Sequence, residues 1–387
     1  MRIINSEESA MDLESNRDIE LSIVLPCLNE EKTIGKCIEK IKEIIEQNNI
    51  KAEIIVADNN STDNSRIIAE KLGAKVVTVL EKGYGNALRK GFAESQGKYI
   101  IFFDSDLSYD PADLPKILEK LRAGYQLVIG SRIKGKIAKN AMPFLHRYIG
   151  TPMMTFLANI LFKTKISDIN SGMRGVTREA LRKLDLHSEG MEFASEMVAK
   201  AKWAGVNIVE VPISFYPDQR GRRPHLRTLR DGWRHLQLMF HFSSLGWFLI
   251  PGTLLSTLSY LLVVTMSNRT YPLLLYFTGL VLNVIGTQIL LIGVIAQGRV
   301  KGSKFKYKPS NFLKLFSKVI KVEIGTLLGT TGCIISGILS ILSGIFNYQT
   351  LFFLFSLAFI QSIQILFSSI LIGLFGVRVS EEEEFFS

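Results

Sequence analysis

Two patterns of hydrophobic and polar positions divide this chain of 387 residues. Up to about residue 235, short apolar runs alternate with segments in which apolar residues recur every three or four positions. Beyond that point, long stretches lack charged side chains altogether. Short buried strands that alternate with amphipathic helices are typical of a mainly parallel α/β sheet. The pattern therefore predicts an α/β domain over 20–225, followed by an all-α domain.

Polar clusters follow three of the strand-like runs in the first region. The expected strands lie at 21–26, 53–57, 75–80 and 99–103. The clusters that follow them are 26–31, 58–63 and 104–106. Ligands of parallel α/β proteins bind beyond the carboxyl ends of the strands. We therefore expect a binding site at this edge of the sheet.

The second region is long and apolar enough to cross a bilayer several times. Lys, Arg, Asp and Glu are absent from 235–268, from 270–298 and from 324–377, and the last run is interrupted by the polar stretch 347–349. A membrane-spanning helix needs about 20 apolar residues. The predicted membrane domain, 245–377, has four transmembrane helices, near 245–266, 271–296, 324–346 and 350–377. Buried helices of a soluble protein are rarely so apolar over this length.

The charge distribution predicts the orientation in the membrane. The connector 297–322 carries eight Lys and Arg residues and no acidic residue, which places it in the cytoplasm. The α/β domain and the acidic tail 378–387 then also lie on the cytoplasmic side. The net charge of +10 is read as attraction to anionic lipid headgroups and not to nucleic acid. Residues 1–19 are polar, lack the apolar core of a signal peptide, and are predicted to be a disordered tail.

Asp104 and Asp106 are the first candidates for chemistry, because they directly follow the apolar run YIIFF. In extended backbone, residues i and i+2 project to the same side, so the two carboxylates converge. Buried acids repel each other unless a cation joins them, and Mg²⁺ or Mn²⁺ prefers such oxygen ligands. Alternatively, Asp104 hydrogen-bonds a ribose and Asp106 is the principal metal ligand. Asp110, before Pro111, is expected to cap a helix.

Glycine-rich nucleotide motifs are missing from this chain. It has no Gly-x-Gly-x-x-Gly after the first strand and no Gly-x-x-x-x-Gly-Lys-Ser/Thr motif. A dinucleotide enzyme or a P-loop ATPase is therefore not expected.

Seven motifs together resemble the GT-A fold glycosyltransferases of family 2, in particular the polyprenol-phosphate sugar transferases. They are SIVLPCLNEE (22–31), IIVADNNSTDNS (54–65), EKGYGNALRKGF (81–92), YIIFFDSDL (99–107), VIGSR (128–132), DINSGMRG (168–175) and EVPISF (210–215). The resemblance implies a GT-A, Rossmann-like domain with a nucleotide-sugar donor at the strand ends. The donor residues that it implies are Pro26, Asn29, Glu31, Asp58, Lys82, Gly83 and Asp104.

The same resemblance implies a divalent cation, Mg²⁺ or Mn²⁺, on Asp104 and Asp106 as the catalytic pair. Ser108 stands where mannose-synthase relatives often carry glutamine. Neither a third protein ligand nor mannose is therefore assumed.

Arginines supply the candidate ligands for an acceptor phosphate. The resemblance implies Arg132 of GSR, Arg147 in the following segment, and Arg174 of the loop that Asp168 and Ser171 shape. Arg220 and Arg222 lie in a glycine-containing loop and suit phosphate contact, because the guanidinium fork pairs with phosphate oxygens. Anchoring to headgroups is the alternative reading of these two.

Two segments are predicted to lie in the membrane interface. Residues 226–244 carry an apolar stripe beside a row of arginines, which is typical of an interfacial amphipathic helix. Residues 141–163 are apolar, but too mixed to cross a bilayer.

The combined reading is an inverting, metal-dependent transfer of one hexose from a UDP- or GDP-sugar to a polyprenyl phosphate. A lipid phosphate is already anionic near neutral pH, since its second pKa is about 6, so a general base is optional. Asp104 or Glu196 could serve, although Glu196 could equally be structural. A processive polysaccharide synthase is one alternative, but its expected Gln-x-x-Arg-Trp motif is absent. A non-catalytic lipid-phosphate-binding protein is the other, and glycines in the third predicted membrane helix make homo-oligomers plausible.

Overall fold

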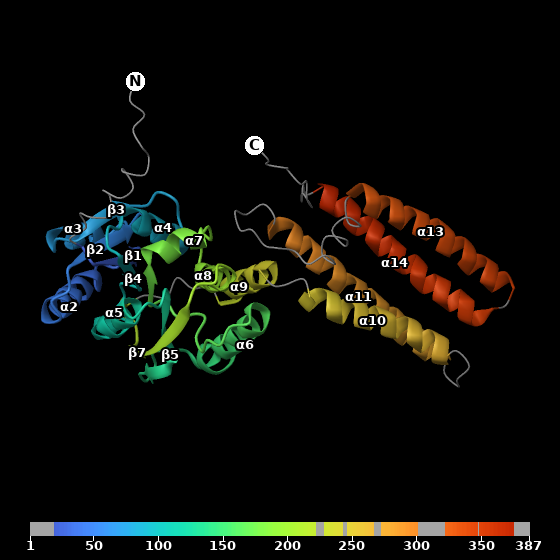
Figure 1. Cartoon of the computed structure of the whole chain (residues 1–387), viewed down its shortest axis with the longest axis horizontal. Coiled ribbons are helices and arrows are strands. Elements are labelled where there is room, and N and C mark those ends of the chain that lie inside the picture. The colour runs from blue at the N-terminus through green and yellow to red at the C-terminus, as the bar shows by residue number, and fades with distance from the viewer. Residues whose placement is uncertain are drawn as a thin grey trace, which may run out of the picture. The chain divides into compact units, whose positions relative to one another are not determined.

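The computed structural model describes residues 19–221, 228–242, 246–266, 272–300, 322–346 and 348–374 (Figure 1). The predicted tail 1–19, apart from its last residue, lies outside the described residues, as do the connector 301–321 and the tail 378–387. The chain divides into two compact units, Met1–Met239 and Phe240–Ser387.

The first unit alternates strands and helices, as its hydrophobic pattern predicts. Its strands are β1 (Leu21–Cys27), β2 (Ala52–Asp58), β3 (Lys75–Thr78), β4 (Tyr99–Phe102), β5 (Leu127–Ile137), β6 (Arg174–Thr177) and β7 (Ile208–Phe215). Its helices are α2 (Ile34–Gln47), α3 (Ser65–Lys71), α4 (Tyr84–Glu94), α5 (Leu114–Arg122), α6 (Thr151–Phe162), α7 (Arg178–Leu184), α8 (Phe193–Trp203) and α9 (Thr228–Phe242). A π-helical turn, His146–Gly150, directly precedes α6, so the apolar segment 141–163 is helical over most of its length.

The strands form one sheet in the order β3-β2-β1-β4-β6-β5-β7. Only β6 runs antiparallel to its neighbours. The register pairs Cys27 with Asp58 and Val24 with Phe102, so β1, β2 and β4 end at the same edge. This edge is where the polar clusters 26–31, 58–63 and 104–106 begin. The predicted convergence of these loops is therefore confirmed.

Helices cover both faces of the sheet because every central strand is apolar on both sides. One face packs against α2 and α5 through residues such as Ile23, Ile38 and Ile117. On the opposite face α4 lies so close to β1 that a Cβ on Gly91 would stand 2.4 Å from Val24 Cγ1. The rings of Phe92 and Phe102 meet edge to face, with centroids 5.2 Å apart, and extend this second core.

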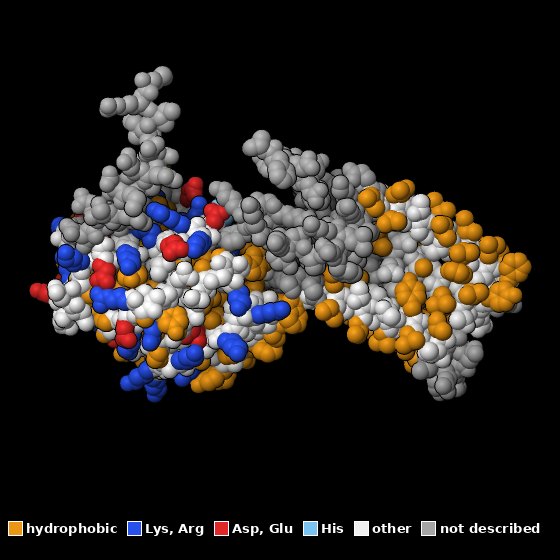
Figure 2. Space-filling model, in the orientation of Figure 1, with side chains coloured by type: hydrophobic (Ala, Val, Ile, Leu, Met, Phe, Trp, Pro, Cys, Tyr) orange, Lys and Arg blue, Asp and Glu red, His pale blue; other side chains and the backbone are white. Residues whose placement is uncertain are grey.

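The second unit consists of four long helices: α10 (Gly246–Met266), α11 (Pro272–Val300), α13 (Val322–Ile345) and α14 (Gln349–Leu374). All four are long and apolar enough to cross a membrane. Figure 2 shows hydrophobic side chains over the visible surface of this unit. The four predicted spans match these helices within a few residues, and the predicted fold class, an α/β domain followed by four apolar helices, is confirmed.

Candidate active site

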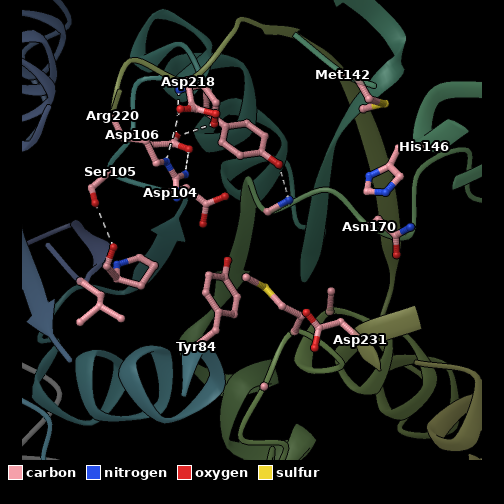
Figure 3. Close-up of a pocket in the computed structure, with 18 of the residues that line it drawn as sticks. Tyr84, Asp104, Ser105, Asp106, Met142, His146, Asn170, Asp218, Arg220 and Asp231 are labelled. Carbon is pink, nitrogen blue, oxygen red and sulfur yellow. Dashed lines mark hydrogen bonds and ion pairs between the residues drawn. The ribbon is translucent and has the colours of Figure 1, made fainter. Parts of the chain in front are cut away.

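A cleft of about 1490 Å³ opens at the carboxyl edge of the sheet, within the first unit. This volume exceeds the roughly 300–1,000 Å³ of a typical small-molecule site. Figure 3 shows two groups of side chains across the cleft: Ser105, Asp106, Asp218 and Arg220 on one side, and Met142, His146 and Asn170 on the other. The cleft therefore has room for two ligands.

The loops after β1 and β2 are tied to each other by hydrogen bonds. The Asn29 backbone N–H donates to Ser61 Oγ at 2.9 Å, and Asn29 Oδ1 accepts from the Thr62 N–H at 2.7 Å. Asn29 has a positive φ of 57°, which asparagine tolerates better than most residues. Pro26 and Asn29 line the cleft, as predicted.

Glu31 and Asp58 support these loops and do not line the cleft. Glu31 Oε2 accepts from the Asn64 N–H at 3.2 Å, and Asp58 Oδ1 accepts from the Ser61 N–H at 3.2 Å. Their predicted contact with a donor stays a prediction.

Asn59, which the sequence reading did not single out, shapes the third side of this end of the cleft. Its amide nitrogen donates to the Glu81 carbonyl at 2.7 Å, and its Oδ1 accepts from the Gly83 N–H at 2.8 Å. A Cβ on Gly83 would lie 2.3 Å from the Glu189 carbonyl oxygen, and Gly83 has a φ of 142°, so only glycine fits. Lys82 and Gly83 both line the cleft, as predicted.

Asp104 and Asp106 meet at the centre of the cleft. Burial and the neighbouring Asp106 charge raise the pKa of Asp104 to about 7, although the Tyr84 hydroxyl donates to its carboxylate. Asp106 is oriented by Ser108, whose backbone N–H and Oγ donate to Asp106 Oδ1 at 3.0 and 2.6 Å. Ser108 therefore positions Asp106 instead of extending toward a ligand.

Arg220 brings a positive charge to the two acids that their neighbours in the sequence do not provide. Its Nη2 contacts Asp106 Oδ2, and its Nη1 lies 3.5 Å from Glu30 Oε1. Backbone hydrogen bonds hold the segment before Arg220 against the loop that carries the acids. The Tyr216 N–H donates to Ser108 O at 2.8 Å, and the Gln219 N–H donates to Asp106 O at 3.1 Å. Burial opposes the charged form, but the Asp106 and Glu30 carboxylates hold the pKa of Arg220 above its ordinary value.

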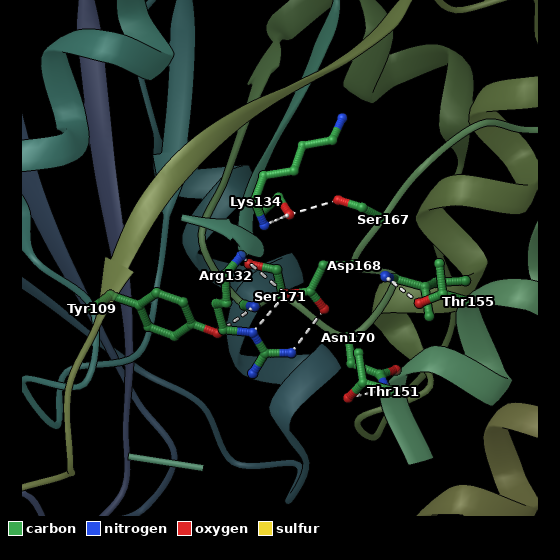
Figure 4. Close-up of polar contacts among 12 residues, drawn as sticks. Tyr109, Arg132, Lys134, Thr151, Thr155, Ser167, Asp168, Asn170 and Ser171 are labelled. Carbon is green, nitrogen blue, oxygen red and sulfur yellow. Dashed lines mark hydrogen bonds and ion pairs between the residues drawn. The ribbon is translucent and has the colours of Figure 1, made fainter. Parts of the chain in front are cut away.

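Arg132 forms a buried, bidentate ion pair with Asp168 (Figure 4). Its Nε and Nη2 lie 2.7 and 2.8 Å from the two carboxylate oxygens, and its guanidinium carbon lies 5.1 Å from the centre of the Phe215 ring. Burial lowers its pKa, but the Asp168 charge outweighs this and holds the pKa above its ordinary value. Arg132 lines the cleft, so a fixed positive charge faces the same space as the two acids.

Known proteins share both this catalytic unit and most of the remaining chain. The model of the glycosyl transferase family 2 domain matches residues 22–185. The low-salt glycan biosynthesis hexosyltransferase Agl6 of Haloferax volcanii is 34% identical over 333 residues, which is 84% of this chain and 79% of that protein. The chain belongs to glycosyl transferase family 2. This glycosyltransferase has the GT-A type of sheet expected for the family.

Two further similarities cover a smaller share of the chain. The dolichyl-phosphate hexose transferase of Haloferax volcanii is 32% identical over 197 residues, 51% of this chain and 82% of that protein. A crystal structure of glucosyl-3-phosphoglycerate synthase from Mycobacterium tuberculosis, in complex with Mn²⁺, UDP and glucosyl-3-phosphoglycerate, covers 63% of this chain and 86% of its own. That likeness has a TM-score of 0.46 at 23% identity.

The donor set of the glycosyltransferase fits a divalent cation that substrate phosphates help to hold. Asp104 and Asp106 both line the cleft, and burial together with the neighbouring Asp106 charge raises the pKa of Asp104, which a bound cation would offset. The described residues contain no group of three or more His, Cys, Asp or Glu side chains that could hold a metal. Mg²⁺ typically takes one or two carboxylates and completes its shell with water and phosphate. Two carboxylates suffice for such a site.

The other predicted acceptor arginines lie in different surroundings. Arg174 is fully buried, and its guanidinium donates to the carbonyls of Ile169, Ser171 and Ala194, so it holds the loop and does not reach the cleft. Arg147 lies over the Tyr148 ring and outside the cleft lining. Arg222 lies outside the described residues. The contacts of Arg174 thus correct its reading as a phosphate ligand, while the roles of Arg147 and Arg222 stay predictions.

Glu196, one of the two candidate bases, has a structural position. It is buried, accepts from the backbone N–H groups of His187 and Ser188, and pairs with Lys200 at 2.7 Å. This leaves Asp104 as the candidate that faces the cleft.

Helix α9, which falls within the segment 226–244 predicted to lie in the membrane interface, adds further residues to the cleft. Arg230, Arg234 and His235 line the cleft. His235 Nδ1 lies 2.7 Å from Ser195 Oγ, and burial, with the Arg174 charge, lowers its pKa to about 4. The missed residues Glu30, Tyr84, Tyr109 and Asn170 also line it. All four lie inside or next to the family motifs, so these motifs are the feature of the sequence that could have identified them.

Proposed function

We propose that this glycosyltransferase moves one hexose from a UDP- or GDP-sugar to a polyprenyl phosphate at the cytoplasmic face of a membrane. The observation that carries the proposal is a single cleft in which the pair Asp104 and Asp106 faces the cations Arg132 and Arg220. Two anionic substrates repel each other, so they can react only where fixed positive charge offsets that repulsion.

The donor is assigned to the end of the cleft lined by the loops after β1, β2 and β3. Backbone and amide groups around Asn29, Asn59 and Gly83 are fixed there by hydrogen bonds between loops. Such preformed polar walls suit a nucleotide, whose base and ribose need directed hydrogen bonds. The diphosphate then reaches Asp104 and Asp106, where a bound Mg²⁺ or Mn²⁺ would stabilise the departing nucleoside diphosphate.

A lipid acceptor is favoured by the apolar surface at the other end of the cleft. Exposed side chains on α6, on the π-helical turn and just before that turn include Phe144, Ile149, Met153 and Phe156, of which Phe144 is 72% exposed and Phe156 65%. The same segment contributes Leu145 and Met154 to the cleft lining. Exposed apolar patches of this kind mark membrane or partner surfaces.

Helix α9 provides a second apolar surface. It buries Asp231, His235 and Met239, while Trp233, on the predicted apolar stripe, is 59% exposed. A tryptophan beside arginines is typical of the membrane interface. The four apolar helices and the basic connector then imply a multi-pass protein whose catalytic unit is cytoplasmic.

The reaction that this geometry supports is a direct displacement. A phosphate oxygen of the acceptor forms a bond to the anomeric carbon as the bond from that carbon to the donor diphosphate breaks. Arg132 and Arg220 would hold the acceptor phosphate, and Arg220 must leave Asp106 to do so. One displacement inverts the anomeric configuration, and no base is needed because the acceptor oxygen carries no proton near neutral pH.

The names of two relatives support the chemistry. Agl6 is named as a hexosyltransferase, and the second Haloferax protein as a dolichyl-phosphate hexose transferase. The proposal extends both names to this chain.

The experiment is a donor panel with the purified full-length protein. Labelled UDP- and GDP-hexoses are incubated with polyprenyl phosphate and Mn²⁺ or Mg²⁺, with EDTA as the control. We expect one donor to give an organic-extractable glycolipid, and EDTA to abolish it. Polymer formation without polyprenyl phosphate, or transfer unaffected by EDTA, would contradict the proposal.

A further inference from the structure

Backbone hydrogen bonds to neighbouring elements hold the loop 167–172 in place. The backbone N–H groups of Ser167 and Asp168 donate to Glu210 Oε1 at 2.7 and 3.1 Å. The Ile169 N–H donates to Thr155 Oγ1 at 3.2 Å (Figure 4). A loop with so many fixed contacts has little freedom to rearrange. Its remaining polar groups therefore point where the fold places them.

Asn170 is the residue of this loop that combines an unpartnered buried atom with a place in the cleft lining. Its Oδ1 is buried and has no hydrogen-bond partner among the described residues, and its Nδ2 lies 3.5 Å from Thr151 Oγ1. Asn170 lines the cleft, across from Asp106 and Arg220 (Figure 3). Ser171 Oγ is also buried and unpartnered, but it does not line the cleft. A buried acceptor without a partner has lost the hydrogen bonds that it makes in water, so Asn170 Oδ1 is suited to a ligand that donates a hydrogen bond.

Three parts of the substrates could contact Asn170 Oδ1: the phosphates, the nucleotide and the hexose. Their hydrogen-bonding groups decide which of them suits this atom. An amide oxygen only accepts hydrogen bonds, and the oxygens of an ionised phosphate also only accept. The lipid phosphate and the donor diphosphate are therefore poor partners. The nucleotide is assigned to the far end of the cleft, beside Asn29 and Asn59. The hydroxyl groups of the hexose remain, and each can donate.

We propose that Asn170 Oδ1 accepts a hydrogen bond from a hydroxyl of the transferred hexose and so contributes to sugar selection. The proposal rests on the proposed function and names a sugar subsite within the same cleft.

The backbone beside Asn170 packs directly against one of the acids. A Cβ on Gly172 would lie 3.1 Å from the Tyr109 hydroxyl oxygen and 3.2 Å from Asp104 Oδ2. The Gly172 N–H donates to that hydroxyl at 2.6 Å, which fixes the loop there. Because Gly172 lacks a side chain, the loop can approach Asp104 this closely, and Asn170 is held near the acids where the donor diphosphate is proposed to lie.

The test compares Asn170→Leu and Asn170→Asp with the wild type. Leucine has a similar size and no acceptor, whereas aspartate keeps the acceptor and adds a charge. Asn140→Asp is the matched control, because Asn140 also lines the cleft and the substitution adds the same charge. Affinities are measured by calorimetry with Mn²⁺ for UDP- and GDP-hexoses and for UDP and GDP alone.

We expect Asn170→Leu to weaken binding of the preferred nucleotide hexose about tenfold and to leave the affinity for the bare nucleoside diphosphate unchanged. Preference over the epimer at one carbon should shrink by a similar factor, since selectivity of this kind comes from unpaired polar groups. Asn170→Asp should retain the preference once the charge effect seen in Asn140→Asp is subtracted. Retained bare-nucleotide affinity also shows that the variants are folded.

Three results would overturn the inference. Equal loss for all epimers would make Asn170 a structural residue, and unchanged hexose affinity would remove it from the subsite. A raised KM for polyprenyl phosphate with unchanged donor preference would place its amide on the acceptor. Wild-type protein that binds nucleotide hexoses but does not transfer them to polyprenyl phosphate would defeat the proposed function and leave this inference standing.

Discussion

The two ends of the cleft are built differently. At the donor end, side chains and backbone groups of three loops satisfy one another, as when Asn29 bonds to Ser61 and Thr62 and Asn59 to Gly83. At the acceptor end, large apolar side chains such as Phe156 are exposed.

Under the proposed function, this difference means that the two substrates are recognised in different ways. A nucleotide sugar would bind between walls that hydrogen bonds between the loops fix before it arrives, which lowers the entropic cost of binding. A polyprenyl chain needs apolar surface and no fixed geometry. Asp104, Asp106 and Arg220 lie where the two ends meet, so substitutions of these residues test whether the two ends differ in this way.

Asp106→Asn should cause the largest loss. It removes the charge that pairs with Arg220 and would bind the cation, so we expect transfer to fall by at least about 10³-fold. Single-turnover rates with saturating donor and acceptor measure the effect. Asp110→Asn, on the helix cap beside the cleft loop, should stay within about threefold. An Asp106→Asn enzyme that keeps a tenth of the wild-type rate would remove the acid pair from the mechanism.

Arg220→Ala should have opposite effects on cation binding and on acceptor binding. In the structure the Arg220 guanidinium pairs with the Asp106 carboxylate. Removal of Arg220 leaves this carboxylate free to bind a cation. The affinity for Mn²⁺ in the absence of donor should therefore rise several-fold. The KM for polyprenyl phosphate should rise by about 10- to 100-fold, since a charge-assisted contact of roughly 1.5–3 kcal/mol is lost. Electron paramagnetic resonance of free Mn²⁺ and steady-state kinetics measure the two effects.

Arg66→Ala is the control for Arg220→Ala, because Arg66 forms an exposed ion pair with Glu70 on α3. Weaker Mn²⁺ binding in Arg220→Ala would show that Arg220 helps the cation instead of standing in its place.

Phe156→Ser should affect only the lipid. We expect the KM for a long-chain polyprenyl phosphate to rise by about tenfold, within the roughly 1.5–3 kcal/mol that burial of a phenylalanine contributes. A short, water-soluble prenyl phosphate should show little change. Ile67→Ser, at an exposed site on α3, is the control. Equal effects on both acceptors would mean that α6 shapes the cleft and does not contact the lipid chain.

The pH dependence of stability concerns unfolding and not transfer, so it is the least direct test of the comparison. Burial lowers the pKa of His235 from about 6.5 to about 4. Between these values the unfolded chain binds a proton that the folded protein excludes, so stability is lost as pH falls from about 6.5 to 4, by on the order of 3 kcal/mol. Above pH 6.5 both states are neutral and the contribution is constant.

His235→Gln should remove this term. Its melting temperature should therefore fall less than that of the wild type between pH 7 and pH 5, as measured by intrinsic fluorescence in detergent. Parallel loss in both proteins would show that His235 does not drive the pH response.

The strands, the membrane helices and the acid pair could be predicted because each leaves a local pattern. Asp104 and Asp106 follow an apolar run, and the strand-end rule places them at the cleft. Arg174 could not be read in this way, because only the fold shows that backbone carbonyls take up its guanidinium. The contact between Arg220 and Asp106 joins positions 114 residues apart, which no local pattern reveals.

The product of a single turnover tests the central claim most directly. A donor of known anomeric configuration, polyprenyl phosphate and the purified protein should give one glycolipid for each nucleoside diphosphate released, with the opposite configuration by nuclear magnetic resonance. Retained configuration, or release of nucleoside diphosphate without a hexose on the lipid phosphate, would contradict direct transfer between two anions in this cleft.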